Sequence, residues 1–150
     1  MGWHITTDPN WVGGWIAKQI GGSFCPAHST TIGLTPDGRQ LCAGVLYEQY
    51  NGRSIVAHIA VSGRMTPAFL AAIFDYPFNV CGVEKVISPI PSDNAASIRL
   101  CAKMGFRQEG RIRDAAPNGD ILLFTLPNNE CRFLGHRYHG KIRARAPART

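Results

Sequence analysis

The feature that most constrains the fold is the segment from residue 55 to 61, which reads Ile-Val-Ala-His-Ile-Ala-Val. Its side chains are apolar on both faces apart from His58, so a strand formed here has to be covered on both sides. Gly63 ends the segment, and Thr66-Pro67 then gives a capping side chain followed by proline at the first helical position. We therefore predict a central strand over 53–62 that leads directly into a helix.

Periodicity and turn residues divide the rest of the chain. Apolar patterns bounded by Gly, Pro and Asn predict strands and helices in the order β, α, three strands, α, β, α, two strands. The predicted strands cover residues 3–7, 29–34, 40–50, 53–62, 84–90, 106–114 and 121–126, and the helices 9–20, 67–76 and 94–104. This order predicts an α/β fold (an α+β mixed sheet) with a central mixed sheet of six to seven strands and helices on both faces.

Length and charge predict one domain followed by a basic tail. The chain has 150 residues, which suits a single core, and carries 16 Lys and Arg against 10 Asp and Glu, a net charge of +6. Five of the basic residues and none of the acids follow Gly135. We therefore expect a nearly neutral domain over 1–135 and a flexible basic tail over 136–150. The tail is suited to bind nucleic acid or another acidic partner, or it serves only as a solubilising segment.

The five cysteines predict neither a disulfide framework nor a metal site. They are widely spaced, form no C-x-x-C pair and have no His at zinc-finger spacing. Cys42 and Cys101 lie in apolar stretches, which favours buried, inert thiols in a reducing cytoplasm. No apolar run approaches the roughly 18 residues of a membrane span, and the first residues do not resemble a signal peptide. We expect a cytoplasmic protein that does not interact with membranes.

One motif points to a family. Residues 94–110 fit the pattern N-x-x-S-x-R-L-x-x-K-x-G-F-x-x-E-G. This pattern resembles the C-terminal half of the GNAT superfamily of acetyl-CoA-dependent N-acetyltransferases. Within it, the chain is most similar to the branch of ribosomal-protein N-terminal acetyltransferases and to small bacteriophage-encoded members. The resemblance covers about residues 29–134 and is specific in 73–134.

The resemblance implies a cofactor site. In the family, two neighbouring parallel strands, here 53–62 and 84–90, open into a V that receives the pantetheine arm of acetyl-CoA. Backbone of the first strand contacts that arm, amides of the following loop hold the pyrophosphate, and a helix-start Asn bonds the arm. The residues that correspond are His58, Ile59, Ala60 and Val61 of the strand, Gly63, Arg64, Met65 and Thr66 of the loop, and Asn94.

The loop also has physical reasons to bind an anion. A strand that runs into a helix start presents free amides and the positive end of the helix dipole, and Arg64 adds a charge. An ordinary strand-to-helix turn capped by Thr66 explains the same residues. The sequence lacks the family's usual Q/R-x-x-G-x-G/A loop, and Cys101-Ala102 stand near the place of the family's frequent general-acid Tyr. A degenerate fold that binds CoA, nucleic acid or a partner is therefore an alternative to an enzyme.

The chemistry that the resemblance implies is direct attack by an amine on the thioester. An amine that titrates near 10.4 must lose a proton, and His58 is the best-placed base. Its alternative role is that of a satisfied core histidine. Glu48 and Glu109 are weaker bases, and Ser97 is a proton donor for the leaving thiolate unless it bonds the preceding turn. The acceptor can be a protein N-terminus, a lysine or a small-molecule amine. We expect no metal, and the sequence is compatible with a homodimer.

Overall fold

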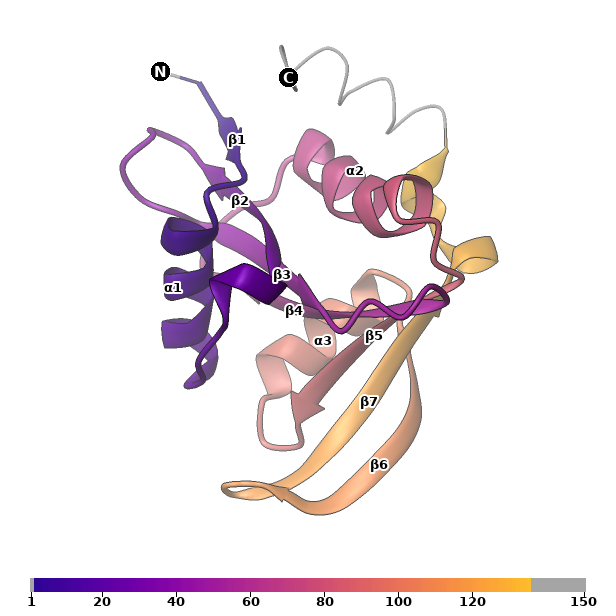
Figure 1. The fold of residues 1–150 in the computed structure, drawn as a ribbon. Helices are drawn as coiled ribbons and strands as arrows, with labels where there is room; N and C mark the ends of the chain where they lie inside the picture. Colours follow the sequence, from indigo (N-terminus) through magenta and orange to yellow (C-terminus); the bar gives the residue numbers. More distant parts are fainter. Residues whose placement is uncertain (1, 136–150) are drawn as a thin grey trace.

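Seven strands and three helices make up the fold in the computed structural model, which describes residues 2–135 (Figure 1). The basic tail over 136–150 lies outside the described residues. Short 3₁₀ turns occur at Pro26–His28, Asn128–Glu130 and Arg132–Leu134, and a π-helical turn at Tyr76–Val80 continues the second helix. The elements are β1 (His4–Thr6), α1 (Pro9–Ile20), β2 (Thr30–Thr35), β3 (Ala43–Glu48), β4 (Ser54–Val61), α2 (Pro67–Asp75), β5 (Lys85–Pro91), α3 (Ala95–Lys103), β6 (Arg107–Ala116) and β7 (Gly119–Pro127).

The sheet is mixed and contains one parallel pair. Its strand order is β1-β2-β3-β4-β5-β7-β6, and every neighbouring pair is antiparallel except β4–β5. The segment over 53–62 that predicted a central strand forms β4, in the middle of the seven. The predicted α/β class, the mixed sheet and the helices on both faces are confirmed.

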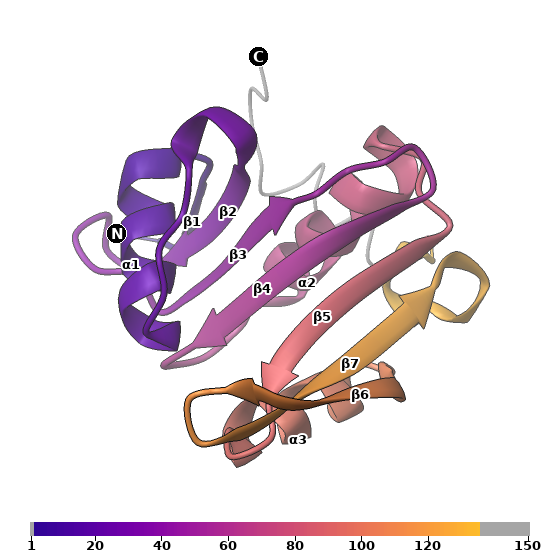
Figure 2. The same cartoon turned by 60° about the horizontal axis from the view of Figure 1, so that its bottom comes forward.

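Alternation along the strands divides the sheet into two faces. On the α1 face lie Gly33, Gly44 and His58, and α1 packs over β2–β4. The opposite face, which we call the α2–α3 face, carries the larger core, built from β-strand residues and from Phe69 and Ile73 of α2. Figure 2 shows α1 in front of the sheet, with α2 and α3 behind it.

Glycines let α1 approach the sheet closely. A Cβ on Gly33 would lie 2.7 Å from Val12 Cγ2, and one on Gly44 would lie 3.1 Å from Ile16 Cδ1. Val12 and Ile16 are fully buried against the sheet at these two glycines. Trp11 and Trp15 are only partly buried at the margin of this contact, because the helix turns Val12 and Ile16 towards the glycines.

Capping side chains begin each helix where the sequence predicted. Asp8 accepts hydrogen bonds from the amides of Asn10 and Trp11, and Thr66 accepts one from Phe69. Tyr47 of β3 holds α2 to the sheet, since its buried hydroxyl donates to the Ile73 carbonyl. Burial raises the pKa of Tyr47 well above its ordinary value.

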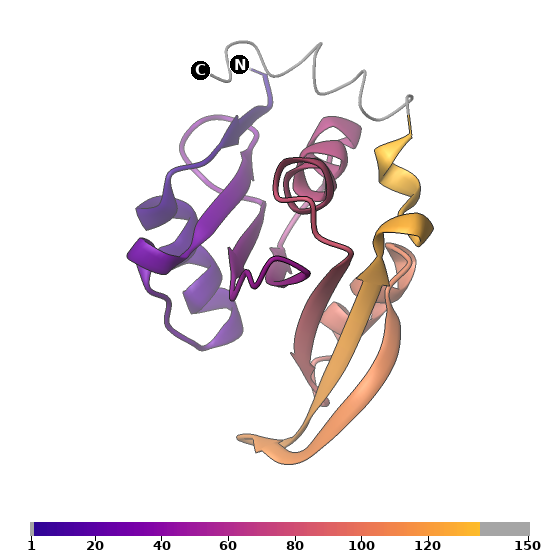
Figure 3. The same ribbon diagram turned by 45° about the vertical axis from the view of Figure 1, so that its right-hand side comes forward.

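The C-terminal half of the sheet has one uncovered face. Among the described residues, α1 covers only the β2–β4 side, so the same face of β5, β7 and β6 has no helix over it. Figure 3 shows the β6–β7 ribbon extending past the rest of the sheet. No described helix is long and apolar enough to cross a membrane.

Candidate functional site

The two parallel strands separate after three paired residues. Ser54, Ile55 and Val56 pair with Lys85, Val86 and Ile87, and beyond Val56 no residue of β4 is paired with β5. β4 continues to Val61 and remains bound to β3 on its other side, while β5 continues to Pro91 and remains bound to β7. The edge of β4 that faces β5 is therefore open over residues 57–61, where the V-shaped opening was expected.

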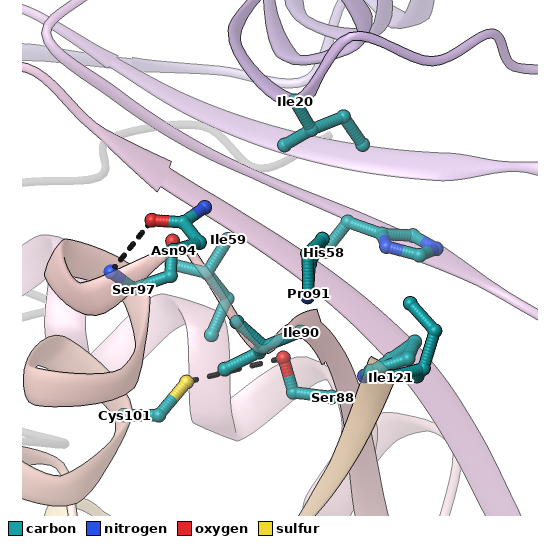
Figure 4. A pocket seen from close by; sticks show the side chains of 11 residues that line it. Ile20, His58, Ile59, Ser88, Ile90, Pro91, Asn94, Ser97, Cys101 and Ile121 are labelled. Atoms are coloured by element: carbon teal, nitrogen blue, oxygen red, sulfur yellow. Dashed lines mark hydrogen bonds between the residues drawn. The ribbon is translucent and has the colours of Figure 1, made fainter. Parts of the chain in front are cut away.

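A cavity of about 200 Å³ lies in this opening (Figure 4). Its walls come from both faces of the sheet. The α2–α3 face contributes Ile59, Ser88, Ile90, Asn94, Ser97 and Cys101, and the α1 face contributes Ile20, His58, Pro89, Pro91 and Ile121. The cavity therefore brings side chains of both faces to one point of the sheet.

His58 is held by a carboxylate on the α1 face. Its Nε2 lies 2.6 Å from Glu48 Oε2, and the two residues are diagonal neighbours on β4 and β3. Both side chains are partly exposed, at 21% and 32%. If Nε2 carries the hydrogen that is donated to Glu48, Nδ1 is left as a proton acceptor. His58 thus has a hydrogen-bond partner, as the satisfied core histidine of the alternative interpretation would, but its side chain is partly exposed.

Asn94 and Ser97 begin α3 at the other side of the cavity. Asn94 caps the helix by accepting a hydrogen bond from the Ser97 amide at 3.2 Å. Its amide nitrogen and the Ser97 hydroxyl have no hydrogen-bond partner among the described residues, and both residues line the cavity. The hydroxyl does not bond the preceding turn, so it is free to meet a ligand.

The loop after β4 offers fewer free amides than expected. The amides of Ser62 and Gly63 both donate to the Cys42 carbonyl, at 2.8 and 3.1 Å. Thr66 is buried and its hydroxyl is used in capping α2. Within the described chain, the amides of Arg64, Met65 and Thr66 have no hydrogen-bond partner, so these three, and not that of Gly63, are available to a bound anion.

Cys101 is a buried wall of the cavity. Burial raises the pKa of its thiol to about 11, although a hydrogen bond to Ser88 acts in the opposite direction. At neutral pH only about one thiol in ten thousand would be ionised, so Cys101 is unsuited to attack a thioester. The expected buried thiol is thus found at Cys101, whereas Cys42, the other thiol expected to be buried, is only partly buried.

Glu109 is a poorer base than His58. Its carboxylate accepts hydrogen bonds from the Thr125 hydroxyl at 2.7 Å and from Lys85 at 3.0 Å. The Thr125 bond first, and Lys85 second, hold the pKa of Glu109 below its ordinary value. Glu109 also lies outside the cavity, in a neighbouring shallow groove of the α1 face.

The shape and chemistry of this site fit an extended thioester ligand. An open strand edge can pair with amide groups of a pantetheine arm, and free amides at the start of α2 suit its phosphates. Arg64 is exposed beside those amides and adds a positive charge. The described residues contain no cluster of three or more His, Cys, Asp or Glu that could hold a metal ion.

These features together define the GNAT fold, and the chain has that fold. It is similar to a chimera of spermidine N-acetyltransferase from Vibrio cholerae with hSSAT, at a TM-score of 0.66 and 12% identity over 90% of this chain and 100% of the other. The Vibrio cholerae enzyme solved with CoA and spermine gives a TM-score of 0.65 and 12% identity over 89% and 98% of the chains.

A probable acetyltransferase gives a TM-score of 0.59 at 19% identity, over 69% of this chain and 63% of the other. Neither a protein-family model nor a curated protein sequence matches this chain. At such identities the likeness establishes the fold alone.

The structure adds residues that the sequence analysis did not single out. Ile20, Pro89, Pro91 and Ile121 line the cavity on the α1 face, and Ser88 lines it on the other. Alternation along the predicted strand 84–90 would have placed Pro89 beside His58, but nothing in the sequence signalled that the end of α1 reaches the same point.

Proposed function

We propose that the chain is an N-acetyltransferase that transfers an acetyl group from acetyl-CoA to a primary amine in a ternary complex. The observation that carries this proposal is the cavity lined from both faces of the sheet, with Asn94 and Ser97 on one side and the His58–Glu48 pair on the other. Direct transfer needs two substrates to meet end to end, and in this proposal the cofactor enters from the α2–α3 face and the amine from the α1 face. The narrower resemblance to the ribosomal-protein branch stays a prediction.

In this proposal the α2–α3 face holds the cofactor. The open edge of β4 over Ile59, Ala60 and Val61 pairs with the pantetheine arm, and the Asn94 amide nitrogen donates a hydrogen bond to it. Free amides from Arg64 to Thr66 hold the pyrophosphate. When bound, the cofactor supplies an acetyl group activated as a thioester.

The α1 face then supplies the base. The amine nitrogen bonds to the acetyl carbon as the carbon–sulfur bond breaks, and His58 Nδ1 takes the proton that the amine loses. Glu48 fixes the tautomer by accepting the Nε2 hydrogen and stabilises the charged ring, as a carboxylate does in a catalytic triad. A β4 amide hydrogen-bonds the carbonyl oxygen. The Ser97 hydroxyl gives a proton to the leaving thiolate and regains one from solvent, to which His58 releases the proton that it took from the amine.

Calorimetric titration with acetyl-CoA tests the cofactor site. We expect Asn94→Ala to weaken binding about three- to tenfold, because one neutral hydrogen bond is lost. That variant also loses a helix cap, so Asn94→Ser is the matched control: serine still caps α3 but has no amide donor. Both variants should bind more weakly than the native chain. Native-like binding by Asn94→Ser would leave Asn94 a purely structural role.

Binding of acetyl-CoA to the native chain tests the proposed function itself. A protein that shows no binding of acetyl-CoA by calorimetry is not an acetyl-CoA-dependent enzyme, and the proposed function would be wrong. Release of CoA in the presence of an amine, detected with a thiol reagent, then separates an enzyme from the degenerate, binding-only alternative.

A further inference from the structure

We infer that the acceptor is an amine with a single positive charge carried on an apolar body, which enters from the α1 face. This inference rests on the proposed function and names the substrate class of the same site. It follows from the walls of the cavity on that face and from the surface that continues away from them.

The mouth on the α1 face is apolar around one base. Apart from His58, the residues that line the cavity on this face are Ile20, Pro89, Pro91 and Ile121, from three different elements. Figure 4 shows Ile20 reaching over the cavity from the end of α1, with Ile121 on the far side of His58. An amine that approaches His58 through the cavity passes between these side chains, and its neighbouring carbons would contact them.

The apolar surface continues across the uncovered part of the sheet. Strand register places Ile112, Ile121 and Pro91 in one row across β6, β7 and β5, and Gly110, Leu123 and Pro89 in the next. Ile112 is 49% exposed, which is unusual for an isoleucine in a strand of this sheet. A shallow groove of about 180 Å³ follows, between Ile87 and Leu123. This face can therefore receive the apolar body of an acceptor whose nitrogen is at His58.

Charges on this face do not favour a second cation. Glu48 already contacts His58. Among the described residues that line the cavity and the groove, Glu109 is the only carboxylate. It is bound by Lys85 and Thr125 at the far end of the groove, where Lys85 also adds positive charge. A second ammonium on the acceptor would lose hydration there without gaining a partner.

We therefore do not expect a polyamine, the acceptor named for a protein of the same fold, to be the acceptor of this chain. The Vibrio cholerae enzyme was solved with spermine, a polyamine, but it shares only 12% identity with this chain. The walls of the mouth in the present chain are suited to an alkyl or aromatic amine, or to an amine on an apolar side of a peptide.

Two adducts that differ by one charge test the inference without requiring turnover. In each, CoA is joined through its sulfur and an acetyl bridge to an amine nitrogen, of hexylamine in one and hexane-1,6-diamine in the other. We expect calorimetry to show that the hexylamine adduct binds at least about tenfold more tightly than the diamine adduct, and more tightly than CoA. Initial rates with the free amines should rank in the same order.

Surface variants supply the controls. Ile121→Asp places a carboxylate at the mouth and should narrow or reverse the preference for the hexylamine adduct, whereas Val80→Asp, at a residue 64% exposed after α2, should leave it unchanged. Equal or tighter binding of the diamine adduct by the native chain overturns the inference, and so does a hexylamine adduct that binds no better than CoA. In both cases CoA binding survives, which distinguishes them from failure of the proposed function, where CoA itself does not bind.

Discussion

Glu48 shows how a single residue gains a role from its strand register. It is the last residue of β3, and its pairing with Val56 brings its carboxylate diagonally beside His58, at 2.6 Å. From the sequence it was only a weaker candidate for the base. In the proposed mechanism it is a positioning residue, which acts on the amine only through the histidine ring.

Removing the Glu48 carboxylate should slow acetyl transfer without weakening the binding of acetyl-CoA. We expect Glu48→Ala to lower kcat by about tenfold or more, because the ring of His58 loses its partner, while the KM for acetyl-CoA stays unchanged. Glu48→Gln should retain more activity than Glu48→Ala, since its side-chain oxygen can accept the same hydrogen. Steady-state kinetics of both variants measure this.

A second glutamate on the same face provides the control. Glu109→Ala removes a carboxylate that contacts Lys85 and Thr125 but not His58, so its kcat should match that of the native chain. If Glu48→Ala and Glu109→Ala lose the same activity, or if neither does, the carboxylate is not part of the base.

At the scale of the element, α1 carries two adjacent glycines with different surroundings. A Cβ on Gly13 would lie 2.4 Å from Cε2 of Phe24, so this glycine makes room for the ring. A Cβ on Gly14 would have no heavy atom within 4 Å. Gly13 is therefore a packing position, whereas Gly14 is partly exposed and a side chain there would meet open space.

These glycines give a matched pair of variants. Gly14→Ala should stabilise the protein by up to about 1 kcal/mol, the difference in helix propensity between glycine and alanine. Gly13→Ala gains the same propensity but displaces the Phe24 ring, so it should be less stable than Gly14→Ala by about 1 kcal/mol or more. Urea unfolding followed by circular dichroism measures both, and equal gains would contradict the packing role of Gly13.

The β6–β7 ribbon is fastened near its turn by Asp120. Its carboxylate accepts hydrogen bonds from the Asp114 amide and from Arg111 Nε, and its own amide donates to the Ser92 hydroxyl before α3. Asp114 has a φ of 55°, a backbone conformation that the Asp120 contact helps to hold. The Asp114 amide first, and Arg111 second, hold the pKa of Asp120 below its ordinary value of 3.8.

This lowered pKa makes part of the stability depend on pH. Because the folded pKa lies below the unfolded one, the contribution of Asp120 is complete above pH 4 and is lost as the pH falls through the folded value. The difference in unfolding free energy between the native chain and Asp120→Asn should therefore be larger at pH 7 than at pH 2.5. A difference that is constant with pH would be inconsistent with this role.

For the whole molecule, alternation and capping signals were enough to predict the fold. The strand over 53–62, the cap Thr66 and the motif over 94–110 indicated the order of elements and one side of the cavity. The other side depended on contacts between distant segments. The approach of Ile20 to His58 requires the close packing of α1 on Gly33 and Gly44. The Gly63 amide is unavailable to a ligand because it donates to the carbonyl of Cys42, which is 21 residues earlier in the chain. Local patterns carry no information on either.

Three rungs between β4 and β5 are the only strand pairing that joins the two halves of the described sheet. This short pairing can act as a hinge between four strands on one side and three on the other. A ligand that hydrogen-bonds along the open edge of β4 would lengthen the connection, and bonds far from the hinge oppose rotation of the two halves most strongly. Ligand binding would thus reduce the relative motion of both halves of the sheet, including strands that do not contact the ligand.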